Sequence, residues 1–103
     1  MNDKINLDEK SFSIVCDILK KNLKGMNAKT YIYGSRAKGK NRKYSDIDIA
    51  VKAENNIPFS IMAHLSYDFE ESFLDYFVDV IDLNATSENF IKHIEKDLVE
   101  FSY

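Results

Sequence analysis

Two aspartates stand two positions apart in the segment 45–51, Ser-Asp-Ile-Asp-Ile-Ala-Val. Its acidic and aliphatic residues alternate as they do in a β-strand with one buried face. Because successive side chains of a strand point to opposite faces, Asp46 and Asp48 would share one face while the isoleucines enter a core. Neighbouring carboxylates repel each other unless a cation lies between them, and Mg²⁺ is usually held by one or two carboxylates together with substrate phosphates. The pair therefore indicates a magnesium site, although two solvent-facing acids at a strand end would show the same pattern.

A glycine and a serine precede these acids at a spacing that would let the chain turn back between them. Gly34-Ser35 follows the β-branched and aromatic segment 30–33, which is typical of a strand. A residue without a side chain lets phosphate oxygens approach the backbone, and the following N–H groups and the Ser35 hydroxyl can donate hydrogen bonds to them. Ten residues separate Ser35 from Asp46. The chain can therefore turn back so that phosphate donors face metal-binding carboxylates, whereas the dipeptide alone would indicate an ordinary turn.

Other catalytic patterns fit the sequence less well. Residues 34–40 match the first seven positions of a P-loop, but Asn41 stands where Ser or Thr must bind Mg²⁺, and a polar loop follows instead of a long helix. The two histidines, His64 and His93, lack the spacing of zinc ligands. We therefore reject a P-loop and do not expect a zinc site.

The rest of the chain supplies the elements that would position this segment. Helical spacing of apolar residues predicts a helix over 8–24, a second from Pro58 and a last one after a cap at Thr86 or Ser87. β-branched and apolar segments predict strands over 30–33, 46–52 and 76–83. The second helix is expected to bury Phe59, Met62, Leu65, Phe69 and Phe73, and the last helix to bury Phe90, Ile91, Ile94, Leu98 and Phe101. The order helix–strand–strand–helix–strand–helix predicts one α/β domain over residues 1–103.

Composition and charge narrow the function class. The hydrophobic share of 45% is enough for a core, and no apolar run approaches the roughly 20 residues of a membrane span. The single cysteine, Cys16, and an N-terminus without an apolar signal core predict a cytoplasmic protein. The net charge of −3 hides an asymmetry, because residues 1–52 carry twelve Lys or Arg against six Asp or Glu. No acid lies between Asp17 and Asp46, so we expect either a solvated basic surface or an anionic ligand in this half.

The combined pattern Gly-Ser-x10-Asp-x-Asp resembles the signature of the DNA polymerase β-like nucleotidyltransferase superfamily, and of its minimal nucleotidyltransferase branch in particular. The resemblance is carried by residues 32–39 and 44–50 and, more loosely, by 78–83, and it covers most of the chain. It implies the nucleotidyltransferase fold, a short mixed β-sheet with helices packed on it, which agrees with the predicted element order.

The resemblance also implies a third carboxylate on a neighbouring strand. Asp79 and Asp82 are both available, and being three residues apart they would face opposite sides, so strand parity alone does not choose between them. The family pattern places the acid inside an aliphatic run, which matches Asp79. The resemblance then assigns Asp46, Asp48 and Asp79 to catalysis and to Mg²⁺, two ions being expected. It assigns Gly34, Ser35 and Arg36 to the phosphates of a nucleoside triphosphate, with ATP the expected co-substrate.

Minimal members of this family usually work with a small helical HEPN-domain protein, and many such pairs are toxin and antitoxin. The resemblance implies that this chain is the antitoxin, which transfers AMP from ATP to a tyrosine of the HEPN ribonuclease. Two alternatives remain open: a catalytic subunit acting on a small molecule, and an antitoxin that neutralises by binding alone. Clustered, repelling carboxylates disfavour the pure binder.

Other features of the sequence concern the binding of a partner. Only about 20 residues follow the third predicted strand, so we expect a partner, a dimer or a large substrate to complete the acceptor site. The second helix and the segment after it carry an acidic patch, Asp68, Glu70, Glu71 and Asp75, which is either a solvated face or a dock for a basic partner. We expect no membrane and no sequence-specific nucleic acid as partner, and a homo-oligomer is left open by surplus aromatic side chains.

Overall fold

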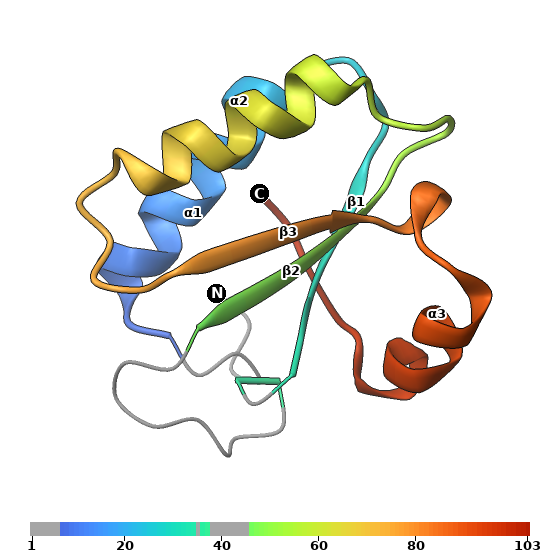
Figure 1. Cartoon of the computed structure of the whole chain (residues 1–103). Helices are drawn as coiled ribbons and strands as arrows, with labels where there is room; N and C mark the ends of the chain where they lie inside the picture. Colours follow the sequence, from blue (N-terminus) through green and yellow to red (C-terminus); the bar gives the residue numbers. More distant parts are fainter. Residues whose placement is uncertain (1–6, 35, 38–45) are drawn as a thin grey trace.

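The computed structural model describes residues 7–34, 36, 37 and 46–103, which form three α-helices and one four-stranded mixed sheet (Figure 1). The sheet order is β3-β2-β1-β4, with β2 and β3 parallel and the other two pairs antiparallel. Along the chain the elements are α1 (Glu9–Asn22), β1 (Lys29–Tyr33), β2 (Ile47–Lys52), α2 (Phe59–Glu70), β3 (Val78–Asp82), α3 (Glu88–Ile94) and β4 (Val99–Phe101). The predicted fold class is confirmed. Within the described residues no helix has the length and apolar character that a membrane crossing needs.

The sheet separates two helical layers. Helices α1 and α2 lie together on one face and α3 lies on the other (Figure 1). The larger core fills the α1 and α2 side, where Ile47, Ile49 and Val51 of β2 are fully buried. The smaller core joins Tyr33 and Ala50 to Ile94 of α3. The predicted alternation of β2 therefore holds, and it leaves Asp48 on the α3 face, next to a core too small to cover it.

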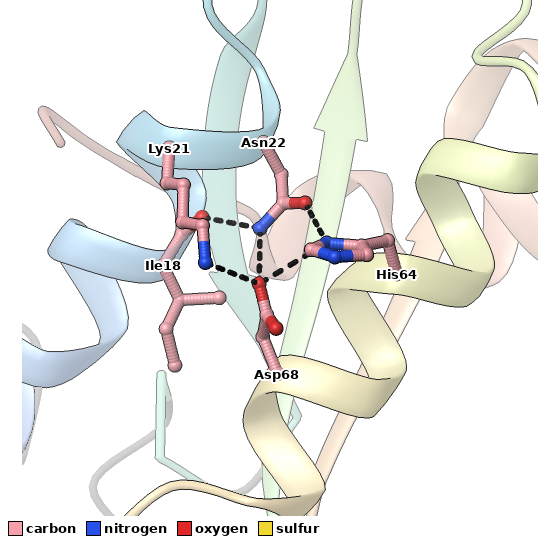
Figure 2. Close-up of polar contacts among 5 residues, drawn as sticks. All are labelled: Ile18, Lys21, Asn22, His64 and Asp68. Carbon is pink, nitrogen blue, oxygen red and sulfur yellow. Dashed lines mark hydrogen bonds and ion pairs between the residues drawn. The ribbon is translucent and has the colours of Figure 1, made fainter.

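Polar side chains hold α1 to α2 on the outer face of the larger core (Figure 2). The Asn22 amide donates to Asp68 Oδ2 at 2.9 Å and to the Ile18 carbonyl at 2.9 Å. The Nδ1 atom of His64 lies 2.7 Å from Asn22 Oδ1 and 3.2 Å from Asp68 Oδ2, and Lys21 Nζ lies 3.8 Å from the same carboxylate oxygen. Asp68 therefore belongs to an interhelical contact. This member of the predicted acidic patch stabilises the packing of α1 on α2.

Replacing Asp68 by alanine should lower the free energy of unfolding by about 1 to 3 kcal/mol, because the part-buried Asn22 amide loses a charged acceptor. Urea unfolding of the purified chain measures this loss. The control is Glu71→Ala, an exposed acid one residue beyond α2, which should change the unfolding free energy by less than about 0.5 kcal/mol. Equal losses in both variants would contradict a specific role for Asp68.

The end of the chain differs from the sequence prediction. The last helix begins after its cap Ser87, as expected, but it ends at Ile94, and Val99–Phe101 form strand β4 instead of continuing the helix. Strand β4 pairs with β1, whose Thr30 hydroxyl donates to the Phe101 carbonyl at 2.8 Å. Leu98 and Phe101 fit helical spacing, but over so few residues an apolar pattern also suits a strand, and the open edge of β1 decides between them.

The predicted apolar stripe of the second helix is also only partly correct. Leu65 and Phe69 are buried and Met62 is half-buried, whereas Phe59 and Phe73 are 87% and 93% exposed. Phe59 is the first residue of α2 and Phe73 lies beyond its end at Glu70. Helical spacing places side chains on one face only within a helix, so it does not apply to Phe73, whereas Phe59 begins the helix and is exposed there.

Candidate active site

Two predicted site residues, Asp48 and Asp79, meet Tyr33 where β1 ends and where β2 and β3 begin. Asp48 and Asp79 are register partners on the parallel strands β2 and β3, and Tyr33 of β1 stands opposite Asp48. Residues directly opposite each other share a face of the sheet, so these side chains form a row on the α3 face. Asp46 immediately precedes β2 and is exposed. The sequence pattern thus brings two acids from different strands into one row.

The electrostatics show that these acids act on one another. Burial raises the pKa of Asp48, and repulsion by the charges of Asp79 and Asp46 raises it further. The pKa of Tyr33 is raised to about 12, mainly by burial and then by the charges of Asp48 and Asp79. Negative charge has therefore accumulated in a half-buried place, which favours a cation or a proton there.

The donor set fits Mg²⁺. Carboxylate oxygens are hard ligands, and Asp48 and Asp79 are aligned by the register of two strands. Within the described residues no group of three His, Cys, Asp or Glu side chains forms a ready-made metal site. Mg²⁺ sites commonly use one or two carboxylates and complete their coordination with substrate phosphates and water. Asp48 and Asp79, with Asp46 nearby, are therefore enough as the ligands that the protein would contribute.

Gly34 ends β1 directly against this row. Its φ is 78°, and a Cβ atom built on it would lie 2.6 Å from Asp48 Oδ2. An L-residue would be strained at this φ, and its side chain would also have to displace the carboxylate. The glycine predicted to admit phosphate thus also leaves room for Asp48. The predicted phosphate ligand Ser35 and the basic segment 38–43 lie outside the described residues.

Gly34→Ala should lower nucleotidyl transfer about 10- to 100-fold, because it moves the Asp48 carboxylate. The chain offers a matched control in Gly25, whose φ is 79° but whose added Cβ would meet nothing within 4 Å. Gly25→Ala carries the same backbone strain and should keep full activity. Steady-state rates of both variants, each measured below its melting temperature, test this prediction. An equal loss of activity in both would refute the role of the contact between position 34 and the Asp48 carboxylate.

Arg36 has a different setting from the one expected. Its side chain is only 2% exposed, and the guanidinium lies 4.3 Å from the centre of the Tyr76 ring, in a cation–π contact. The Tyr76 hydroxyl in turn donates to Asp8 Oδ1 at 3.3 Å. Arg36 therefore ties the turn after β1 to the segment that leads into β3. Its role at the phosphates stays a prediction.

The structure separates the two candidates for the third carboxylate. Asp79 is exposed and aligned with Asp48, whereas Asp82 is 7% exposed and faces away from this row. Asp82 Oδ2 accepts from the Ile57 N–H at 2.8 Å and Oδ1 from the Asn84 N–H at 3.0 Å. Asp82 thus caps the 3-10 turn after β3 and is occupied by backbone donors, while Asp79 is the acid placed beside Asp48.

Sequence reasoning missed two residues of this neighbourhood. Tyr33 was assigned only to a strand, although its register places it beside Asp48. Phe77 is 72% exposed and lies two residues before Asp79, on the same side of the chain by strand alternation. That alternation, counted backwards from Asp79, is a signal that the sequence already contained.

The chain is similar to proteins of known class. Residues 15–100 match the family model of polymerase beta, nucleotidyltransferase. A curated relative, the probable protein adenylyltransferase MntA of Haemophilus influenzae (strain ATCC 51907 / DSM 11121 / KW20 / Rd), is 42% identical over 66 residues. The match covers 64% of this chain and 58% of that relative, so the chain spans less than two thirds of the relative's length.

Solved structures agree. A crystal structure of a toxin-antitoxin with AMP-PNP superposes with a TM-score of 0.72 at 26% identity, covering 94% of this chain and 75% of that one. A structure of tri-AMPylated Shewanella oneidensis HEPN toxin in complex with MNT antitoxin superposes with a TM-score of 0.69 at 22% identity, covering 94% of this chain and 74% of that one. At this identity the likeness supports the fold and nothing further. The resemblance noted in the motifs is therefore confirmed. Because the family match extends over most of the chain, this protein belongs to the polymerase beta nucleotidyltransferase family.

Proposed function

We propose that this chain is a Mg²⁺-dependent nucleotidyltransferase that transfers AMP from ATP to a tyrosine hydroxyl of a HEPN-type toxin and so acts as its antitoxin. The alignment of Asp48 with Asp79 beside Gly34 is the observation that carries this proposal. The 42% identity to a protein named as an adenylyltransferase supports the reaction. The likeness to a toxin-antitoxin bound to AMP-PNP supports both the nucleotide and the kind of partner.

The position of each site residue indicates its role in the transfer. Asp46 and Asp48 would hold the metal, and Asp79 would share it on the neighbouring strand. When bound, Mg²⁺ offsets the charge of the carboxylates and of the triphosphate. Asp79 orients the acceptor hydroxyl and accepts its proton. The hydroxyl oxygen bonds to the α-phosphorus of ATP, the bond from that phosphorus to the β-phosphate bridge breaks, and pyrophosphate leaves on the Gly34 side.

Tyr33 is the register partner of Asp48 in this scheme. It is buried, its pKa is raised to about 12, and its ring packs edge-on against Phe90 of α3 at a centroid distance of 6.3 Å. A neutral phenol packed in this way adds no charge to an already crowded row. Helix α3 thereby supports the site from the face on which the acids lie.

Transfer can be tested with ATP labelled on its α-phosphate. The chain is incubated with the label and Mg²⁺, with the HEPN-type partner or with aminoglycosides as acceptors. We expect label on the partner protein only. Label on an aminoglycoside would favour the small-molecule reading, and tight binding of the partner without any label would favour neutralisation by binding alone.

A further inference from the structure

A cavity of about 410 Å³ lies along β3 at the position of Asp79. Its walls come from the end of α2, from the connection that follows and from the start of β3, and they include Phe69, Glu70, Asp75, Tyr76, Phe77 and Asp79. The volume is in the range of about 300 to 1,000 Å³ that is usual for ligand sites. Strand β3 is at the edge of the described sheet, so the cavity borders Asp79 on the outer side of the sheet.

The order of the strands places this cavity on the acceptor side. The attacking and leaving oxygens of a phosphoryl transfer lie roughly in line, on opposite sides of the phosphorus. The outgoing phosphates belong near Gly34 at the end of β1, and β2 with Asp48 lies between β1 and β3. The attacking hydroxyl must therefore arrive from the β3 side, where the cavity and Asp79 are.

The charge of the cavity selects its occupant. Three acidic residues, Glu70, Asp75 and Asp79, line it, and no lysine or arginine is among the described residues that do so. A triphosphate would be repelled, whereas a cationic side chain would be attracted. The remaining wall is apolar and aromatic, through Phe69, Tyr76 and Phe77, which suits a ring.

Phe77 provides the most exposed part of that aromatic wall. It is 72% exposed although it lines the cavity, and it directly precedes β3, where its carbonyl accepts from the Ile47 N–H at 2.9 Å. A large aromatic ring beside a reactive carboxylate, left open to solvent, is available to pack against the ring of a bound tyrosine.

We propose that this cavity docks the acceptor segment of the partner, a tyrosine with a lysine or arginine close to it in sequence, with Phe77 against the tyrosine ring and Glu70 and Asp75 facing the basic side chain. The proposal rests on the transfer of AMP to a tyrosine proposed above. It adds what selects the tyrosine: an aromatic wall next to Asp79 and an acidic rim that prefers a basic neighbour.

Two phenylalanine variants test the aromatic contact. Phe77→Ala should raise KM for the HEPN-type partner about tenfold and leave KM for ATP unchanged. Phe73→Ala is the matched control, since Phe73 is 93% exposed and does not line this cavity. An unchanged partner KM in Phe77→Ala would overturn the docking site, and so would a raised KM for ATP, which would assign the cavity to the nucleotide.

The charge preference is tested with two synthetic peptides, one with a tyrosine flanked by lysines and one with the same tyrosine flanked by glutamates. We expect the lysine peptide to be the better acceptor, about tenfold in kcat/KM, and Asp75→Asn to narrow that ratio. Equal use of both peptides by the unmodified chain would overturn the charge argument. Absence of AMP transfer to partner and peptides alike would overturn the proposed function itself, whereas transfer that is indifferent to Phe77 and Asp75 overturns the docking site alone.

Discussion

Asp48→Asn should lower AMP transfer about 1,000-fold or more and, at the same time, raise the melting temperature of the chain without metal. The loss of activity follows because the asparagine amide is a much poorer ligand for Mg²⁺ and leaves the triphosphate charge uncompensated. The gain in stability follows because Asp48 is held beside Asp79 and Asp46 in a half-buried place, where its charge is unfavourable.

The pH dependence of that gain has a definite sign. The pKa of Asp48 is raised by folding, so the folded chain binds this proton more tightly than the unfolded chain does. The destabilisation by ionised Asp48 is complete above the folded pKa and is relieved as the pH falls through it toward the ordinary pKa of an aspartate. The melting temperature of Asp48→Asn should therefore exceed that of the unmodified chain by a few degrees at neutral pH, and the two should converge in acid.

Thermal unfolding with and without Mg²⁺ and ATP gives the measurement. Ligands that bind the folded state alone raise its stability by RT ln(1 + [L]/Kd), about 2.7 kcal/mol at 100 times Kd. The unmodified chain should gain this stabilisation and Asp48→Asn should not. Asp17→Asn, which removes an exposed acid of α1, is the control for the change in net charge. If Asp48→Asn were no more stable than Asp17→Asn at neutral pH, the crowding of the acids would be refuted.

The second large effect separates Asp79 from Asp82. Asp79→Asn should lower kcat about 100- to 1,000-fold, because it removes the group that accepts the proton of the acceptor hydroxyl. It should not lower the unfolding free energy, since Asp79 is exposed and its charge repels that of Asp48.

Asp82→Asn should give the opposite result. Its carboxylate accepts two backbone N–H groups in a buried place, so the substitution should cost about 1 to 3 kcal/mol of stability. Activity measured below the melting temperature should stay within about twofold of the unmodified chain. A kcat loss in Asp82→Asn as large as in Asp79→Asn would mean that the wrong acid has been assigned.

Strand alternation alone predicted much of the site. It placed Asp46 and Asp48 on one face and the aliphatic residues of β2 in the core, because a two-residue period is a property of the chain itself. It could not choose between Asp79 and Asp82, because that choice depends on which residue of β3 pairs with Asp48. The register of two parallel strands is set by the packing of the whole domain.

Tertiary context also explains two corrections and one contact that the sequence did not predict. Residues 98–101 satisfied a helical pattern, but residues 99–101 pair with the open edge of β1 as strand β4. The pattern of α2 was right within the helix and failed for Phe59 and Phe73, which lie at its start and beyond its end. Arg36 stands in a motif that indicates phosphate binding, yet its cation–π partner Tyr76 is forty residues away and could not be read from local sequence.

The most direct test of the central claim is the mass of the HEPN-type partner after incubation with this chain, ATP and Mg²⁺, followed by peptide mapping. We predict that the partner gains one or more AMP units, that fragmentation places them on tyrosine, and that Asp48→Asn abolishes the gain. A partner whose mass is unchanged by the unmodified chain, or a gain that persists in Asp48→Asn, would contradict the account.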